Sequence, residues 1–275
     1  MIGGGKAGNI VSPNPNTIAV TEAFQLDLTA VMLKNLIPAI CALIATIVLA
    51  SLLAKKAGDG ISQNDLEAAP AEKLPNALQA FAGPLTVIVL LALRPLAKIS
   101  VDPLIALPLG GLVCILVTGN IRNLIPYTDF GLSKVIGVAI LLIGTGTIAG
   151  IIKASALQKD MTTLLSAMNM PAFILAPLSG ILMAAATAST TAGSTVASQT
   201  FSGTLLAAGV PALSAAAMIH AGATVLDSLP HGSFFHATGG SVYMDIKNRM
   251  KLIPFEALIG LTSTIVAVIL YLVTA

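Results

Sequence analysis

The sequence predicts an all-α integral membrane protein, and two observations support this fold class. Hydrophobic residues make up 56% of the 275 residues and charged residues only 9%, with a mean hydropathy of +0.92; soluble domains carry roughly 25% charged residues. The apolar residues also come in blocks of about 20, the length that a helix needs to cross a hydrocarbon core of about 30 Å. They lack the strict alternation of barrel strands. We therefore expect several helices that cross the cytoplasmic membrane.

The first regular block, Asn35–Ala54, closes at two lysines and precedes a polar stretch at 57–76. This stretch contains acidic residues, glycines and prolines, a composition typical of a linker. We therefore divide the chain into residues 1–56, a linker at 57–76, and residues 77–275. Placing the linker in the cytoplasm puts more Lys and Arg residues near the cytoplasmic ends of the spans, as the positive-inside rule requires.

The region 77–275 mixes regular and irregular segments. Residues 171–210 run from an apolar arm through "TASTTAGST" into a second apolar arm, which is typical of a re-entrant hairpin. Residues 212–240 begin as a helix too short to span and stop at "DSLPHGSFFHATGG", which predicts a broken helix. Regular spans are predicted at 77–93, 103–119, 133–152 and 252–273.

A third irregular segment, "GGGKAGNIVSPNPNT" at 3–17, precedes the first span. Non-helical backbone at membrane depth survives only where protein or a water-filled cavity satisfies it, so such segments mark a transport pathway. Transporters bind substrates at the ends of such discontinuous helices. The residues predicted to bind substrate are neutral donors for carboxylate and hydroxyl groups: Asn14, Asn16, Thr17, Ser189, Thr190, Thr191, Ser194 and Thr195. Two alternatives remain open: "SPNPNT" as a turn outside the membrane, and the Ser/Thr run as a surface for helix packing through small residues.

All three histidines lie near Asp227, at 220, 231 and 236. Ionisable groups at membrane depth are expensive and indicate function. Histidine, with an ordinary pKa near 6.5, and a partly buried aspartate both suit proton binding and release. We predict Asp227 and His231 as the proton-coupling groups. The alternatives are that His220 only packs in a core, and that His231 and His236 lie in a loop and cap backbone carbonyls.

Four long segments together resemble the gluconate permease family (GntP type) of the ion transporter superfamily: "GGGKAGNIVSPNPNTIAVTEAF", "LIGTGTIAGIIKAS", "HAGATVLDSLPHGSFFHATGG" and "MDIKNRMKLIPFEALIGL". The resemblance implies two inverted repeats, each with a re-entrant hairpin and a broken helix. It also implies that the tip at Asn14 to Thr17 faces the tip at Ser189 to Thr195 across one substrate. Members of that family are longer, so residues 1–56 are expected to be the end of an incomplete first repeat and 77–275 the second repeat.

The function predicted from the residues and the resemblance is a proton symporter of gluconate or a related hydroxycarboxylate. No enzymatic activity, cofactor or metal is expected, and the formal charge of +2 without a basic patch argues against nucleic acid. The expected partners are the substrate anion, protons and the bilayer, with a missing N-terminal half or a second copy as open alternatives. Two other functions are considered. One is a non-transporting membrane remnant or assembly partner. The other is a metalloenzyme with the three histidines and Asp227 as ligands, whose spacing matches no common motif.

Overall fold

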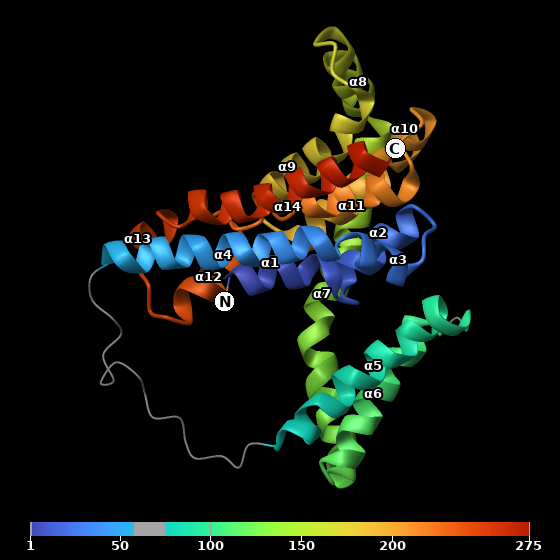
Figure 1. The fold of residues 1–275 in the computed structure, drawn as a ribbon, viewed down its shortest axis with the longest axis vertical. Helices are drawn as coiled ribbons and strands as arrows, with labels where there is room; N and C mark the ends of the chain where they lie inside the picture. The colour runs from blue at the N-terminus through green and yellow to red at the C-terminus, as the bar shows by residue number, and fades with distance from the viewer. Residues whose placement is uncertain (1, 58–74, 100, 275) are drawn as a thin grey trace. The chain divides into compact units, whose positions relative to one another are not determined.

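The computed structural model describes residues 2–57, 75–99 and 101–274 (Figure 1). Within these ranges every regular element is a helix and no strand occurs, as the composition predicts. Three helical stretches are long and apolar enough to cross a membrane, namely Leu36–Lys55, Ile121–Ala154 and Ile246–Thr274. Most of the predicted linker, residues 58–74, lies outside the described residues.

The chain divides into two compact units, which are described separately. The first unit consists of Met1–Leu53 with Val138–Ala275, and the second of Ala54–Gly137. This division follows from which residues pack against each other within the chain. The division predicted from the sequence, into parts of two inverted repeats, concerns the symmetry of the transporter fold, and it stays a prediction.

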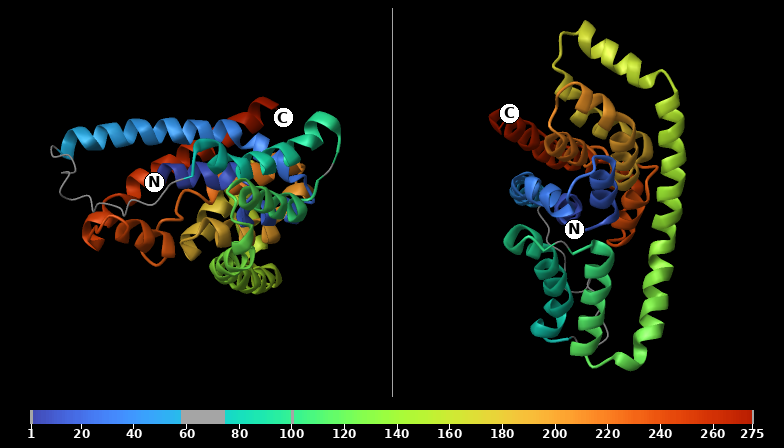
Figure 2. Two further views of the ribbon diagram at one scale, coloured as in Figure 1. Left: turned by 90° about the horizontal axis from the view of Figure 1, so that it is seen from below. Right: turned by 90° about the vertical axis from the view of Figure 1, so that its right-hand side faces the viewer.

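The second unit is built around α5 (Ala77–Ala97) and α6 (Pro103–Val117), which run side by side in Figure 2. Glycines allow the close approach of these helices, since a Cβ atom on Gly83 would lie 3.0 Å from the carbonyl oxygen of Gly110. The 15 residues of α6 extend about 22 Å at 1.5 Å per residue, less than the span predicted at 103–119. The helix stops early because Gly119 turns the chain with a φ of +71°.

The long helix α7 (Leu124–Ala154) follows the short 3₁₀ helix η2 (Ile121–Asn123) and belongs to both units. It begins nine residues before the predicted span at 133–152 (133 − 124 = 9). The first turns of α7 contain polar residues, so the continuous apolar block in the sequence begins later than the helix does.

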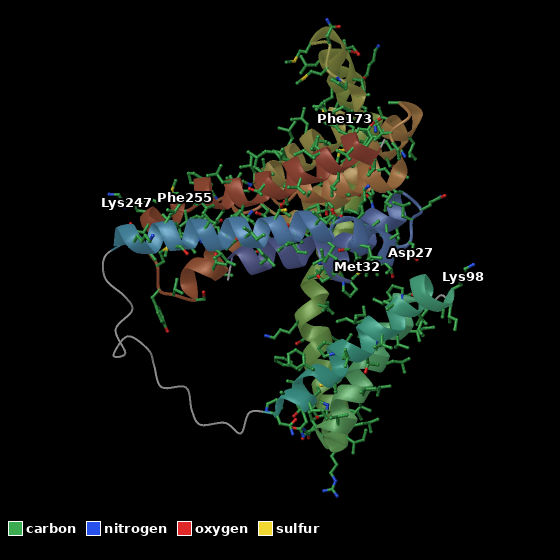
Figure 3. The ribbon with its side chains drawn as sticks, in the orientation of Figure 1. Asp27, Met32, Lys98, Phe173, Lys247 and Phe255 are labelled. Carbon is green, nitrogen blue, oxygen red and sulfur yellow. The ribbon has the colours of Figure 1, made fainter. Side chains whose placement is uncertain are left out.

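The N-terminal part of the first unit contains four helices: α1 (Ile2–Val11), α2 (Pro15–Ala23), α3 (Leu28–Lys34) and α4 (Leu36–Ala57). Asp27, labelled in Figure 3, begins α3, because its carboxylate accepts a hydrogen bond from the N–H of Ala30 at 3.0 Å. α1 packs between α4 and α14 through a small buried cluster that includes Ala7, Ile10 and Ile259.

The C-terminal part of the first unit contains the remaining elements: α8 (Leu157–Ala167), η3 (Ala172–Ile174), α9 (Leu175–Thr187), α10 (Thr190–Ala207), α11 (Ala212–Gly222), α12 (Ser233–Gly240), α13 (Ile246–Met250) and α14 (Ile253–Thr274). α9 and α10 form a helical hairpin over the segment predicted at 171–210. α11 packs antiparallel to α9, and small residues permit this contact: a Cβ on Gly222 would lie 2.5 Å from the carbonyl oxygen of Pro177. Close backbone approach through small residues is how helices associate in membranes, where burying apolar surface from water contributes little.

The main buried cluster joins α2, α3, α9, α10, α11 and α14. Val20, Leu175, Phe201 and Ile219 lie in it, and each is almost fully buried. The helices that contribute to this cluster pack tightly around the hairpin of α9 and α10. The predicted hairpin and the predicted broken helix at 212–240 therefore share one core.

Charged residues around α13 differ in their exposure. Asp245 begins this helix, and the hydrogen bond that it accepts from the N–H of Asn248 holds the pKa of the carboxyl below its ordinary value. Lys247, labelled in Figure 3, is exposed. Arg249, two residues further along the same short helix, is buried.

Three of the interruptions between helices in the first unit fall within the irregular segments recognised in the sequence: residues 12–14, between α1 and α2; 188–189, between α9 and α10; and 223–232, between α11 and α12. Contrary to the prediction, much of each irregular segment is helical, since α1 covers residues 3–11 and α12 covers 233–240, so only these short interruptions lack helix. Their side chains form the candidate site.

Candidate functional site

The interruption between α1 and α2 is held by its own polar side chains. Asn14 accepts a hydrogen bond from the N–H of Thr17 at 3.0 Å, and it donates to the carbonyl oxygen of Asn9 and the hydroxyl of Ser12, both at 2.8 Å. Thr17 donates to the carbonyl oxygen of Ser12 at 2.8 Å. Pro15 stands in the first turn of α2, where no N–H is needed for the helix. The structure thus places Asn14 and Thr17 as groups that shape the bend.

The tip between α9 and α10 is a two-residue turn. Ala188 has a φ of +45°, a left-handed conformation that is unfavourable for a residue with a side chain. Ser189 begins α10, and its hydroxyl accepts from the N–H of Ala192 at 3.3 Å. Gly193 lets the two arms meet, because a Cβ there would lie 2.5 Å from the Cα of Ala184. The turn is therefore fixed by close packing and by a helix cap.

Two residues of the predicted set form hydrogen bonds within α10 itself. Ser194 and Thr195 donate to the carbonyl oxygen of Thr191 at 3.3 Å and 2.7 Å, and both are buried. Their hydroxyl hydrogens are directed along the helix, as is common for Ser and Thr in apolar helices. Ser194 and Thr195 are small side chains, and they therefore fill little space next to the tip between α9 and α10.

One contact brings the first and second interruptions together. The hydroxyl of Thr191 donates to the side-chain oxygen of Asn16, two residues that are 175 positions apart in the sequence. Each belongs to the N-terminal turn of its helix, α10 and α2 respectively. The N-terminal turns of two helices thus lie side by side, and both present N–H groups and the positive end of a helix dipole. Such an arrangement attracts anions.

The third interruption contributes Asp227, which is buried and carries a set of donors. Lys6 of α1 forms an ion pair with its Oδ1 and also donates to the carbonyl oxygen of Thr224. Ser228 donates to Oδ1 at 2.8 Å, and Thr190 donates to Oδ2 at 2.6 Å. Both members of the ion pair are almost entirely removed from solvent, with side chains that are 1% and 5% exposed for Lys6 and Asp227.

Thr190 connects the ion pair to the two tips. Its hydroxyl accepts a hydrogen bond from the amide of Asn9 at 3.2 Å while donating to Asp227. The carbonyl oxygen of Asn9 in turn accepts from Asn14. Hydrogen bonds therefore link Lys6 to Asp227, Asp227 to Thr190 and Thr190 to the side chain of Asn9, whose backbone carbonyl contacts the bend between α1 and α2.

The histidines occupy different environments. His231 is exposed, and it is not among the described residues that contact Asp227. The Nε2–H group of His236 donates a hydrogen bond to the carbonyl oxygen of Pro230, 2.8 Å away, as the capping alternative expects, although His236 lies on α12 and not in a loop. His220 is fully buried on α11, and neither ring nitrogen has a hydrogen-bond partner among the described residues. Among the described residues, no group of three His, Cys, Asp or Glu side chains is placed to hold a metal ion.

Lys6 was not among the site residues predicted from the sequence. The signal was present: Lys6 is a lone cation in an apolar and glycine-rich segment, and Asp227 is a lone acid in another. The pair of Arg249 and Glu256 was not predicted from the sequence either. Both side chains are buried and form an ion pair, in which Nη2 of Arg249 donates to Oε2 of Glu256 at 3.2 Å.

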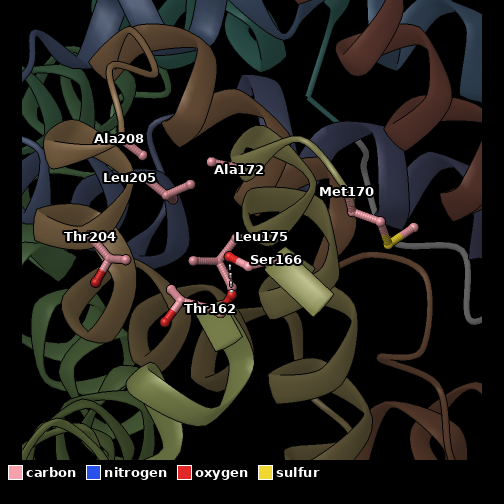
Figure 4. Close-up of a pocket in the computed structure, with 8 residues that line it drawn as sticks. All are labelled: Thr162, Ser166, Met170, Ala172, Leu175, Thr204, Leu205 and Ala208. Carbon is pink, nitrogen blue, oxygen red and sulfur yellow. Dashed lines mark hydrogen bonds between the residues drawn. The ribbon is translucent and has the colours of Figure 1, made fainter. Parts of the chain in front are cut away.

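A cavity of about 210 Å³ lies elsewhere in the first unit, between α8, α9 and α10 (Figure 4). It is lined by Thr162, Ser166, Met170, Ala172, Leu175, Thr204, Leu205 and Ala208. The hydroxyls of Thr162 and Ser166 donate into their own helix, and no charged side chain lines the cavity. Its chemistry does not suit a carboxylate, and it contains none of the predicted site residues.

Comparison with known proteins gives one informative relative. The chain is 55% identical over 271 residues to a protein of Haemophilus influenzae that is named as an uncharacterized transporter. The match includes 98% of this chain but spans only 64% of the length of that protein. No family model and no solved structure matches the chain.

Proposed function

We propose that this chain is all or part of a secondary active transporter that moves gluconate or a related hydroxycarboxylate together with protons across the cytoplasmic membrane. The observation that carries the proposal is the meeting of two interrupted helices at Asn16 and Thr191, next to a buried ion pair. The proximity of these groups supports a site that recognises an anion. The three apolar helical stretches and the transporter name of the relative support membrane transport and a non-enzymatic role.

The substrate site that we propose lies at the adjoining tips. Asn16, Ser189, Thr190 and Thr191 stand at or next to the N-terminal turns, where N–H groups and hydroxyls suit a carboxylate and neighbouring hydroxyls. Asn14 and Thr17 hold the first tip in shape, and Ser194 and Thr195 provide the small volume behind the second. The resemblance to gluconate permeases supports a hydroxycarboxylate as the substrate class.

The proton-coupling groups that we propose are Asp227 and His231. Asp227 is buried beside the tips, where a change of its charge alters the field at the site. His231 is exposed on the same interruption and is suited to exchange protons with solution. In this proposal His231 relays protons and Asp227 holds the coupled proton.

The test is uptake of labelled gluconate and of labelled 3-hydroxybutyrate into proteoliposomes under an imposed proton gradient, acidic outside. The 275-residue chain is compared with the full-length Haemophilus influenzae relative. Uptake by the chain alone, abolished by a protonophore, would establish it as a complete carrier. Uptake by the longer relative alone would make this chain one part of a carrier. The absence of uptake by both proteins would overturn the assignment of a hydroxycarboxylate as the substrate.

A further inference from the structure

The buried pair of Lys6 and Asp227 joins elements that are far apart in the sequence. Lys6 lies on α1, and Asp227 lies in the interruption between α11 and α12. Among contacts between described residues, Lys6 uses two of its three N–H groups, on Asp227 and on the carbonyl oxygen of Thr224. One N–H group of the ammonium is left for a further acceptor. The lysine is therefore a cation that can hold two partners or change between them.

The charged groups around this pair are few. Within the elements that pack here, α10 carries no ionisable residue, and α4 has its basic residues only in its last turn. α14 contributes Glu256, which Arg249 already holds. α11 contributes His220, while Glu22, His231 and His236 are exposed. Asp227 is thus the one carboxylate that balances Lys6 among the described residues.

We infer that Lys6 is the residue that binds the carboxylate of the substrate. Until a proton neutralises the Asp227 carboxylate, that carboxylate is paired with the Lys6 ammonium and keeps the substrate from binding there. This inference rests on the proposed transport of a hydroxycarboxylate. In the resting site the charges are +1 on Lys6 and −1 on Asp227. A proton from solution binds the Asp227 carboxylate, and the anionic carboxylate of the substrate takes its place on the Lys6 ammonium. Lys6 keeps its proton, and the net charge of the site remains zero.

This exchange explains how a proton and an anion become coupled. An isolated charge is costly in a dry site, so protonating Asp227 without substrate leaves Lys6 unbalanced, and binding substrate without the proton leaves an excess negative charge. Each event favours the other by the same factor, as linkage requires. Thr190 and Ser228 still have an acceptor on the protonated Asp227, so the hydrogen bonds to the two tips survive the exchange.

The experiment measures substrate binding and proton uptake on the same purified 275-residue chain in weakly buffered detergent. Gluconate and 3-hydroxybutyrate are the probes, with binding followed by isothermal calorimetry and protons by a pH indicator dye. The wild-type chain is expected to take up about one proton per carboxylate bound. Asp227→Asn mimics the protonated acid and is expected to bind substrate without proton uptake and independently of pH. Lys6→Gln is expected to weaken binding about 10- to 150-fold, the range that a charge-assisted hydrogen bond contributes.

Two controls keep the outcome decisive. Lys159→Gln removes a lysine that is exposed on α8, and it should change neither quantity. Lys6→Gln with Asp227→Asn leaves no lone buried charge, so it should stay folded and yet bind weakly. Wild-type affinity in Lys6→Gln, or undiminished proton uptake in Asp227→Asn, would overturn the exchange while leaving the transporter proposal intact. A wild-type chain that binds neither probe overturns the exchange for these anions, and uptake by the full-length relative then decides the transporter proposal separately.

Discussion

Among the described residues of the first unit, two ion pairs are buried, and they differ in how they are built. Arg249 and Glu256 lie seven positions apart, and both guanidinium NH₂ groups contact the carboxylate. The guanidinium also stacks over Phe235, with 4.8 Å from its carbon to the ring centre, and donates to the hydroxyl of Thr238 at 3.1 Å. Lys6 and Asp227 lie 221 positions apart and share a single nitrogen–oxygen contact.

This difference suggests different roles. A planar guanidinium held by two oxygens, an aromatic ring and a hydroxyl has one favourable geometry, so the Arg249 pair fixes α12 against α13 and α14. An ammonium is a compact charge whose three donors rotate freely, and Lys6 can therefore change partners without moving its helix. We conclude that the first pair is structural and that the second is the one suited to coupling.

The largest effect is expected from removing one member of the structural pair. Arg249→Met leaves Glu256 buried without a partner and should lower the free energy of unfolding by about 3–5 kcal/mol. The double variant Arg249→Met with Glu256→Leu removes both charges and should recover most of this loss. Thermal unfolding in detergent, followed by circular dichroism, gives the stabilities, and proteoliposome uptake gives the activity. The double variant is expected to keep uptake, whereas its counterpart Lys6→Met with Asp227→Leu should fold and lose uptake. Loss of uptake in both would contradict the distinction between the pairs.

The second effect concerns the close contact that supports the coupling pair. A Cβ at Gly260 of α14 would lie 2.6 Å from the carbonyl carbon of Thr224, whose oxygen accepts from Lys6. Gly260→Ala should therefore lower stability by about 1–3 kcal/mol and shift the apparent affinity for substrate. Gly203→Ala is the matched control, because a Cβ there meets nothing within 4 Å on α10. The control should be neutral or more stable by up to about 1 kcal/mol. Equal losses in the two variants would show that the contact has no special role.

A smaller effect is expected at the contact between the two tips. Thr191→Val keeps the volume of the side chain and removes its hydrogen bond to Asn16. The expected cost is about 1 kcal/mol, or roughly a fivefold weaker binding of the labelled probe if this contact aligns the tips. Thr262→Val on α14 removes the hydroxyl of a half-buried threonine that donates within its own helix, and it serves as the comparison. An unchanged Kd in Thr191→Val would separate the contact from substrate binding.

The smallest effect is expected at His220. Its ring is fully buried and neither nitrogen has a described partner, so His220→Leu removes an unsatisfied group. Stability should be unchanged or slightly higher, by no more than about 1 kcal/mol, because the lost desolvation penalty compensates for imperfect packing. Uptake should persist. A complete loss of uptake in a stable variant would show that His220 belongs to the transport machinery and that its burial is functional.

Although residues 3–11 and 233–240 are helical, contrary to the prediction, the sequence predicted the helical class and a break within each of the three irregular segments. Both follow from local composition: apolar blocks are continuous along the chain, and Gly, Pro, Ser and Thr disrupt a helix where they occur. It was less accurate on helix ends, as at α6 and α7, because a helix can continue through polar residues and can stop in apolar ones. The role predicted for Asp227 required this residue to be buried within the membrane. The sequence indicated such burial only through the apolar residues around Asp227.

The sequence by itself indicated that the protein lies in a membrane and that it is helical, and it indicated three segments in which its helices break. The tertiary structure alone decided which of these segments meet. The partners Lys6 and Asp227, and likewise Asn16 and Thr191, are separated by most of the chain, so no local pattern pairs them. Their pairing results from packing of α1, α2, α10 and α11 through small residues. The energetic reason is that a buried charge or amide must find its partner within the folded chain, wherever in the sequence that partner lies.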